Sequence, residues 1–152
     1  MARPREFDTG TFLRQAGELF VKRGYNATSI DELVKVTGVA RGSLYSIFGS
    51  KQGIFIAVLE HAAGQWSESA VPNAQLPAAD LRDDPETLLN LINVAVFEIA
   101  CHSPEIAELT QRVIDANRIT AQSLGQRALD RAGLTDAPAK AVKEKEEKNV
   151  SK

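Results

Sequence analysis

The stretch TSIDELVKVTGVARGSLYSIFGSK, from Thr28 to Lys51, decides the fold of this chain. It reads as two short helices joined by a tight turn. The first carries its apolar residues at the spacing of one buried helical face, at Ile30, Leu33 and Val34. Gly38 can adopt the left-handed conformation that ends a helix, and the second helix begins within two residues. This layout predicts a helix-turn-helix.

The start of the first motif helix is open to two capping registers. Ser29 with Glu32 has the spacing of a capping box, and Thr28 with Asp31 is the competing pair. Ahead of them, residues 9–23 predict another helix, capped by Asp8 or Thr9 and ended by Gly24. We expect the three helices to share one core, made by Phe12, Leu13, Ala16, Leu19, Phe20, Ile30, Leu33, Leu44 and Phe48.

The second motif helix, about residues 40–48, has a face suited to a bulky partner. Val39, Leu44 and Phe48 point towards the core, whereas the opposite face has no acid and no large aliphatic chain. Gly42 lies at the centre of that face and weakens the helix by up to about 1 kcal/mol relative to alanine. Close approach to a duplex major groove would justify it. The alternative is a small helical domain in which Gly42 only ends a turn.

The motif and its flanks resemble the DNA-binding domain of tetracycline-repressor (TetR) family transcriptional regulators over roughly residues 12–59. The matching residues are Ala16, Leu19, Phe20, Gly24, Tyr25, Thr28, Ser29, Ile30, Leu33, Gly38, Val39, Gly42, Ser43, Leu44, Tyr45, Phe48 and Lys51. Two positions depart from the usual pattern: Ala40 replaces a capping Ser, and Ile47 replaces a common His. We expect DNA contacts from Thr28, Ser29, Arg41, Gly42, Ser43, Tyr45, Ser46 and Lys51.

Composition and charge are compatible with this reading. The 152 residues are 43% hydrophobic and 25% charged, which is usual for a soluble globular protein. The net charge of −2 divides into +2 over residues 1–60 and −4 over residues 61–152, so the basic excess lies with the motif. A single cysteine, a polar start without a signal peptide and no long apolar run predict a cytoplasmic protein without a membrane span.

A fourth helix is predicted from Ser50 to Trp66, with Lys51 in its first turn as a phosphate contact. A Pro-punctuated linker, residues 67–83, leads to an apolar helix from Asp84 to about Cys101. Its interruptions, at Asn90, Asn93, Phe97 and Cys101, fall on one stripe that could line an effector pocket. The candidate ligand-binding residues are Trp66, Asn93, Phe97 and Cys101. The alternative is that the stripe is simply the wetter side of the helix.

Ser103-Pro104-Glu105 opens a further long helix, predicted to run to about Ala132 before Gly133. The charged tail, residues 136–152, is expected to be disordered or a frayed helix. The sequence thus predicts an all-α fold: a helix-turn-helix domain (residues 1–50), a helical ligand-binding and dimerisation domain (residues 51–135) and the tail. The second domain looks incomplete, because the chain ends too early for the pair of long helices through which TetR-like regulators usually dimerise.

No catalytic or metal-ligand pattern stands out. His61 and His102 lie on different predicted helices, and we expect no enzyme activity, metal or cofactor. Cys101 is a candidate redox switch, although a small buried hydrophobe is the commoner case. The resemblance implies a homodimeric repressor that binds a double-stranded DNA operator and is released by a small-molecule effector. The rival hypothesis is a helical ligand-binding or interaction protein that no longer binds DNA.

Overall fold

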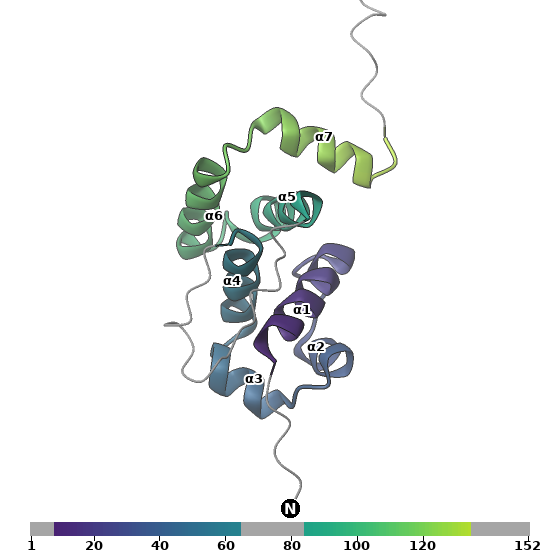
Figure 1. Ribbon diagram of the computed structural model, residues 1–152, viewed down its shortest axis with the longest axis vertical. Helices are drawn as coiled ribbons and strands as arrows, with labels where there is room; N and C mark the ends of the chain where they lie inside the picture. Colours follow the sequence, from purple (N-terminus) through teal and green to yellow (C-terminus); the bar gives the residue numbers. More distant parts are fainter. Residues whose placement is uncertain (1–7, 65–83, 135–152) are drawn as a thin grey trace, which may run out of the picture.

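The computed structural model describes residues 8–64 and 84–134, and all regular secondary structure in these two ranges is helical. Its elements are α1 (Thr9–Arg23), α2 (Ile30–Thr37), α3 (Arg41–Phe48), α4 (Lys51–Ala62), α5 (Pro85–Val94), the π-helical segment η3 (Ala95–Ile99), α6 (Pro104–Ala116) and α7 (Ala121–Arg131). Figure 1 shows α2 and α3 at one end of the long axis, α7 at the other and α5 between them. The predicted all-α class is confirmed.

Local capping chemistry explains where the first helices begin. The Asp8 carboxylate accepts hydrogen bonds from the amides of Gly10 (3.1 Å) and Thr11 (3.3 Å) at the start of α1. The side-chain hydrogen bond from Thr11 is the largest cause that lowers the pKa of Asp8. Ser29 and Glu32 form the predicted capping box: the Glu32 amide donates to Ser29 Oγ (3.2 Å), and the Ser29 amide donates to Glu32 Oε2 (2.9 Å). The register of Ser29 with Glu32 is therefore the correct one.

One continuous apolar core joins the helices. Near the motif it contains Phe12, Leu13, Ala16, Phe20, Leu33 and Leu44, which are all buried. Leu19, Ile30 and Phe48 are only partly buried; Phe48 stacks on Phe12 with ring centroids 5.1 Å apart. The same core continues through α4, α5 and α6, and α4 packs against α1, α3, α5 and α6. The domain boundary at residue 50 remains a prediction.

Helix α4 is shorter than the sequence predicts. It ends at Ala62, and Gly64 follows with a positive φ of 66°. Trp66, the linker (residues 67–83) and the tail (residues 136–152) lie outside the described residues. The predicted place of Trp66 in the effector pocket lies outside them too. Within residues 8–64 and 84–134, none of the helices is long and apolar enough to cross a bilayer.

The predicted regular helix from Asp84 to Cys101 is interrupted by η3. In this segment the Ala100 amide donates to the carbonyl of Ala95 at 2.8 Å, the i→i+5 pattern of a π-helix. The extra residue per turn changes which side chains share a face. Asn93 is 6% exposed and Phe97 is 72% exposed. The predicted polar stripe is therefore divided between the interior and the surface.

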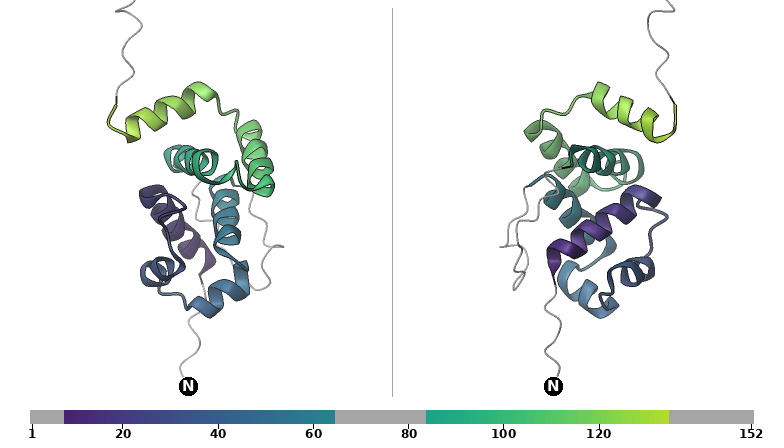
Figure 2. Two further views of the ribbon diagram at one scale, coloured as in Figure 1. Left: turned by 180° about the vertical axis from the view of Figure 1, so that it is seen from behind. Right: turned by 45° about the vertical axis from the view of Figure 1, so that its right-hand side comes forward.

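The single long helix predicted from Ser103 to Ala132 is wrong, because two helices occupy this range. Arg118 adopts a positive φ of 53° after α6 ends, and Thr120 then caps α7. The Ser123 amide donates to Thr120 Oγ1 at 3.1 Å, and the Thr120 amide donates to Ser123 Oγ at 3.1 Å. Figure 2 shows α7 running alongside α5, on which it packs.

Candidate nucleic-acid interface

Helix α3 is attached to the protein by one face and leaves the other open. Leu44 is 1% exposed and provides its fully buried anchor. The opposite face presents Arg41, Gly42, Ser43, Tyr45 and Ser46, all of which are exposed. Tyr45, at 44% exposure, is the largest side chain among them. This arrangement matches the face predicted from the helical spacing.

Gly42 has no packing role within the described structure. A Cβ placed on Gly42 would meet no atom within 4 Å. Neither a positive φ nor a neighbouring side chain requires a glycine there. The position costs helix stability and leaves the backbone of α3 accessible to an incoming molecule.

Arg41 lies at the start of α3 and forms an ion pair with Asp31 of α2. The hydrogen bond with Asp31 is the largest cause that raises the pKa of Arg41, so the guanidinium remains charged. Both side chains are well exposed, at 52% and 76%. Because such exposed pairs contribute little, a phosphate could compete for Arg41.

Two residues expected to contact DNA, Thr28 and Ser29, make hydrogen bonds within the protein. Thr28 is 1% exposed, and its hydroxyl donates to the carbonyl of Gly24 at 2.7 Å. The side chain of Thr28 therefore faces the protein, and we do not include it among the proposed DNA contacts. Ser29 is exposed at the start of α2, with its hydroxyl engaged in the capping box with Glu32.

Lys51 also differs from its predicted role as an open phosphate ligand. Its ammonium donates to the carbonyls of Tyr25 and Thr28, both at 3.0 Å, and lies 4.2 Å from the centroid of the Tyr25 ring. Burial is the main cause that lowers its pKa. Lys51 thus ties the first turn of α4 to the loop between α1 and α2, with at most one donor left for a phosphate.

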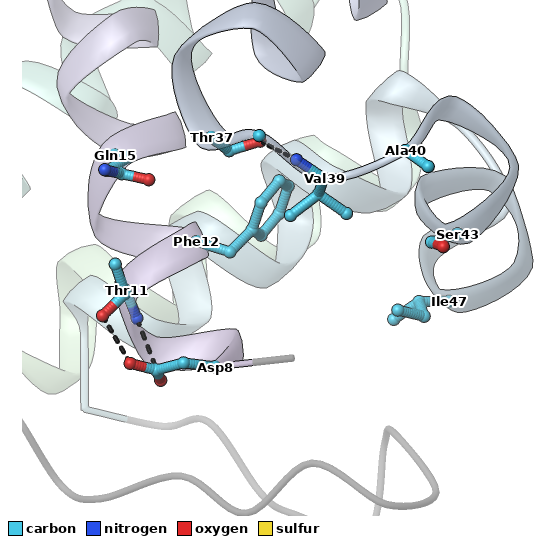
Figure 3. Close-up of a pocket in the computed structure, with 10 residues that line it drawn as sticks. Asp8, Thr11, Phe12, Gln15, Thr37, Val39, Ala40, Ser43 and Ile47 are labelled. Atoms are coloured by element: carbon cyan, nitrogen blue, oxygen red, sulfur yellow. Dashed lines mark hydrogen bonds between the residues drawn. The ribbon is translucent and has the colours of Figure 1, made fainter. Parts of the chain in front are cut away.

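A cavity of about 400 Å³ lies beside α3, between the start of α1 and the α2–α3 turn (Figure 3). Its lining mixes apolar side chains such as Phe12, Val39 and Ile47 with polar ones such as Thr11, Gln15 and Ser43. Asp8 lies at its edge with its carboxylate turned to Thr11. The cavity therefore adjoins the open face of α3 through Ser43.

The three predicted effector-pocket residues that the structure describes do not share one buried face. The side-chain amide of Asn93 donates to the carbonyl of Leu124 at 3.3 Å, whereas Phe97 and Cys101 are exposed. The π-helical segment Ala95–Ile99, which follows Asn93 and contains Phe97, is the physical reason, because it rotates the later residues away from the face of the earlier ones. The expected pocket is corrected accordingly, and the exposure of Cys101 also excludes the buried alternative.

Sequence reasoning missed a polar contact between η3 and the helix-turn-helix. Glu98 Oε2 accepts a hydrogen bond from the amide of Asn26 at 2.8 Å, across 72 positions of sequence. Nothing in the local sequence identifies the pair. A single Glu on an apolar helix is as compatible with exposure to solvent as with a hydrogen bond to a distant loop.

Comparison with known proteins agrees with this geometry. Residues 12–58 match the family described as bacterial regulatory proteins, tetR family. An uncharacterized HTH-type transcriptional regulator, YezE of Bacillus subtilis, is 31% identical over 127 residues, covering 74% of this chain and 65% of YezE. The HTH-type transcriptional repressor ComR of Escherichia coli is 45% identical over 58 residues, covering 38% of this chain and 28% of ComR. The HTH-type transcriptional regulator QacR of Staphylococcus aureus is 42% identical over 53 residues, covering 35% of this chain and 28% of QacR.

The similarity is concentrated in the helix-turn-helix. The chain spans somewhat less than two thirds of YezE and little more than a quarter of ComR and QacR. All three relatives are named as transcriptional regulators or repressors. The segment that carries the open face of α3, residues 12–58, is thus a helix-turn-helix segment of the tetR family of bacterial regulatory proteins.

Proposed function

We propose that this chain is a transcriptional repressor that binds double-stranded DNA through the open face of α3. The observation that carries the proposal is the division of α3 into a buried Leu44 and an exposed, acid-free face within the family-matched segment. A helix of this kind fits a major groove, where side chains read base edges. The name of ComR, a repressor, favours repression.

The proposed contacts follow from exposure and chemistry. Arg41 can pair with a phosphate or a guanine, Ser43 and Ser46 can donate hydrogen bonds, and Tyr45 can pack on bases or sugar. Gly42 allows the backbone to approach closely, and Ser29 lies at the exposed start of α2. Lys51 contributes its charge near the loop between α1 and α2, with most of its hydrogen bonds already used.

We further propose that the chain acts in the cytoplasm as a homodimer on a near-palindromic operator. One short helix reads too few base pairs, and two-fold symmetry doubles the contacts, with the α3 helices about 34–36 Å apart. The helical domain expected to dimerise, residues 51–135, offers a dimer few apolar side chains between residues 84 and 132, because most of those described there fill the chain's own core. Among the described residues of that region, Val96 (40%) and Phe97 (72%) remain exposed. Release by a small-molecule effector is proposed from the family resemblance.

A pair of charge substitutions tests the DNA-binding surface. Ser46→Asp adds a negative charge to the open face of α3, and Gln122→Asp adds the same charge to the exposed surface of α7. Duplexes are first selected by the unaltered chain from a randomised pool, and affinities are then compared across salt concentrations. We expect Ser46→Asp to lower affinity at least about tenfold and Gln122→Asp to change it by less than about twofold, because only the former faces the phosphates.

Equal losses in both variants would reject α3 as the contact surface. If the unaltered chain selects no duplex at all, the rival hypothesis of a helical binding protein without DNA affinity replaces the regulator. Sedimentation tests assembly separately: a chain that remains at 16.5 kDa and also binds DNA singly contradicts the dimer.

A further inference from the structure

The loop between α1 and α2, residues 24–29, is contacted by η3, far along the sequence. Glu98 Oε2 accepts the hydrogen bond from the Asn26 amide at 2.8 Å. Glu98 Oε1 lies against Gly24, where an added Cβ would collide with it. Gly24 has a φ of 84°, a backbone conformation that favours glycine. The position thus favours glycine both for its backbone conformation and for the lack of room for a Cβ. The Glu98 carboxylate therefore fits closely against this loop.

The same loop is held from α4 as well. Lys51 donates to the carbonyls of Tyr25 and Thr28, and the Tyr25 ring packs edge-on against Phe55 with centroids 5.5 Å apart. Lys51 and Glu98 are of opposite charge and interact electrostatically across the loop. One carboxylate and one ammonium thus bind neighbouring backbone groups of a single short segment.

This loop determines how the helix-turn-helix is presented. Gly24 ends α1, and Ser29 caps α2, which packs on α3. A displacement of residues 24–29 therefore moves α2 relative to α1, and α3 with it. Lys51 lies inside the family-matched residues 12–58, whereas Glu98 lies outside them. Glu98 is thus a direct polar link from the later helices to the DNA-reading unit.

We propose that Glu98 is a positioning residue for DNA binding: by holding the Asn26 amide, it fixes the orientation of α2 and α3 relative to α5. The inference rests on the proposed function, since it concerns how the α3 surface is presented. Any rearrangement of α5 or η3 that withdraws Glu98 releases the loop, and the population competent for DNA binding falls. The link thereby gives the later helices a route to control DNA affinity.

The sign of a charge effect tests this role. Glu98→Ala and Glu108→Ala each remove one negative charge, and Glu108 is an exposed residue of α6. Counterion arguments alone predict slightly tighter binding to a duplex in both variants. We expect Glu98→Ala instead to bind the selected duplex about 5- to 20-fold more weakly than Glu108→Ala, as expected for a modest coupling energy. Glu98→Gln keeps an acceptor oxygen for the Asn26 amide and should recover most of the affinity.

Hydrogen exchange provides a readout that does not depend on DNA. In the free protein, well below its unfolding transition, the Asn26 amide should exchange faster in Glu98→Ala but remain protected in Glu98→Gln and Glu108→Ala. Unchanged exchange at Asn26 in Glu98→Ala would overturn the contact. Faster exchange with the same duplex affinity as Glu108→Ala would overturn the positioning role alone. Failure of the unaltered chain to select a duplex would instead reject the proposed function, and the DNA role of Glu98 with it.

Discussion

Helices α3 and α7 lie at opposite ends of the molecule (Figure 1), and they are attached by different means. Helix α3 has an apolar anchor, Leu44, and the side chains of its open face are turned to solvent. Helix α7 has no fully buried residue: Leu124 is only partly buried against the core, and polar contacts add to the attachment. Arg127 donates to Asn90 Oδ1 (3.1 Å) and to Glu86 Oε2 (3.0 Å), and Arg131 donates to the carbonyl of Val21.

The difference shows what each helix has available for a partner. An apolar anchor stabilises α3 without using the polar groups on its outer face, so those groups are available to a ligand. In α7 the Arg side chains are already engaged within the chain. An exposed helix is therefore a candidate interface only when its attachment leaves its polar side chains uncommitted.

The largest expected effect comes from removing the anchor of α3. Leu44→Ala empties a fully buried site and should reduce the free energy of unfolding by about 2–5 kcal/mol. Denaturant unfolding measures this change, with Ser46→Ala on the exposed face of the same helix as the control. A loss below about 1 kcal/mol would mean that α3 is not held by Leu44, since an emptied core site costs more than that.

Removing the polar attachment of α7 should have a smaller effect. Arg127→Met leaves the buried Oδ1 of Asn90 without its partner, which should cost about 1–3 kcal/mol. Hydrogen exchange along α7 and thermal unfolding measure the loss. The double variant Arg127→Met with Asn90→Leu should recover part of it, because both polar groups are then gone. If the double variant loses as much stability as the sum of the two single variants, another contact holds α7.

Tyr45→Ala separates binding from stability on α3. We expect about a tenfold loss of duplex affinity, in the range of a lost base-reading side chain, with an unchanged unfolding midpoint. Gln126→Ala, on the exposed side of α7, is the control for the Tyr45→Ala variant. Ala128→Gly would not serve, because glycine weakens any helix. An unfolding midpoint that drops together with affinity would place Tyr45 in the core and weaken the contrast between the two helices.

The smallest effect concerns the helix starts. Ala40, at the N-cap of α3, makes no side-chain hydrogen bond, whereas Thr120 caps α7. Ala40→Ser should add about 0.5–1 kcal/mol to stability, because the N-cap backbone is already extended. Thr120→Ala should lose about as much, and thermal unfolding can compare both. Destabilisation by Ala40→Ser would show that its hydroxyl cannot reach the first-turn amides.

Local signals predicted the helix-turn-helix well because its elements are set by neighbouring residues. Asp8 and the pair Ser29 with Glu32 are each one of two caps that the sequence allowed, and the structure uses them. Gly38 ends α2 as expected. The open face of α3 also follows from helical spacing alone. A local signal was overlooked at the end of α6: Thr120 and Ser123 have the spacing of a cap, which marks the start of α7.

The remaining features depend on tertiary structure. The roles of Thr28 and Lys51 depend on carbonyls that only the folded loop brings near them. The partial burial of Phe48 likewise depends on where Phe12 lies, so its removal should cost less than that of a fully buried ring. The π-helical turn has no distinctive residue, because Ala95-Val96-Phe97-Glu98-Ile99 is compatible with an ordinary helix.

That π-helical turn has a consequence for insertions and deletions. A π-turn amounts to one residue inserted into a regular helix. Deleting Phe97 would restore α-helical spacing and rotate every later residue by about 100° relative to α5. Glu98 would then leave the Asn26 amide, although no residue that makes the contact had been altered. This part of the chain should therefore accept substitutions at the exposed Phe97 more readily than the loss of the residue itself.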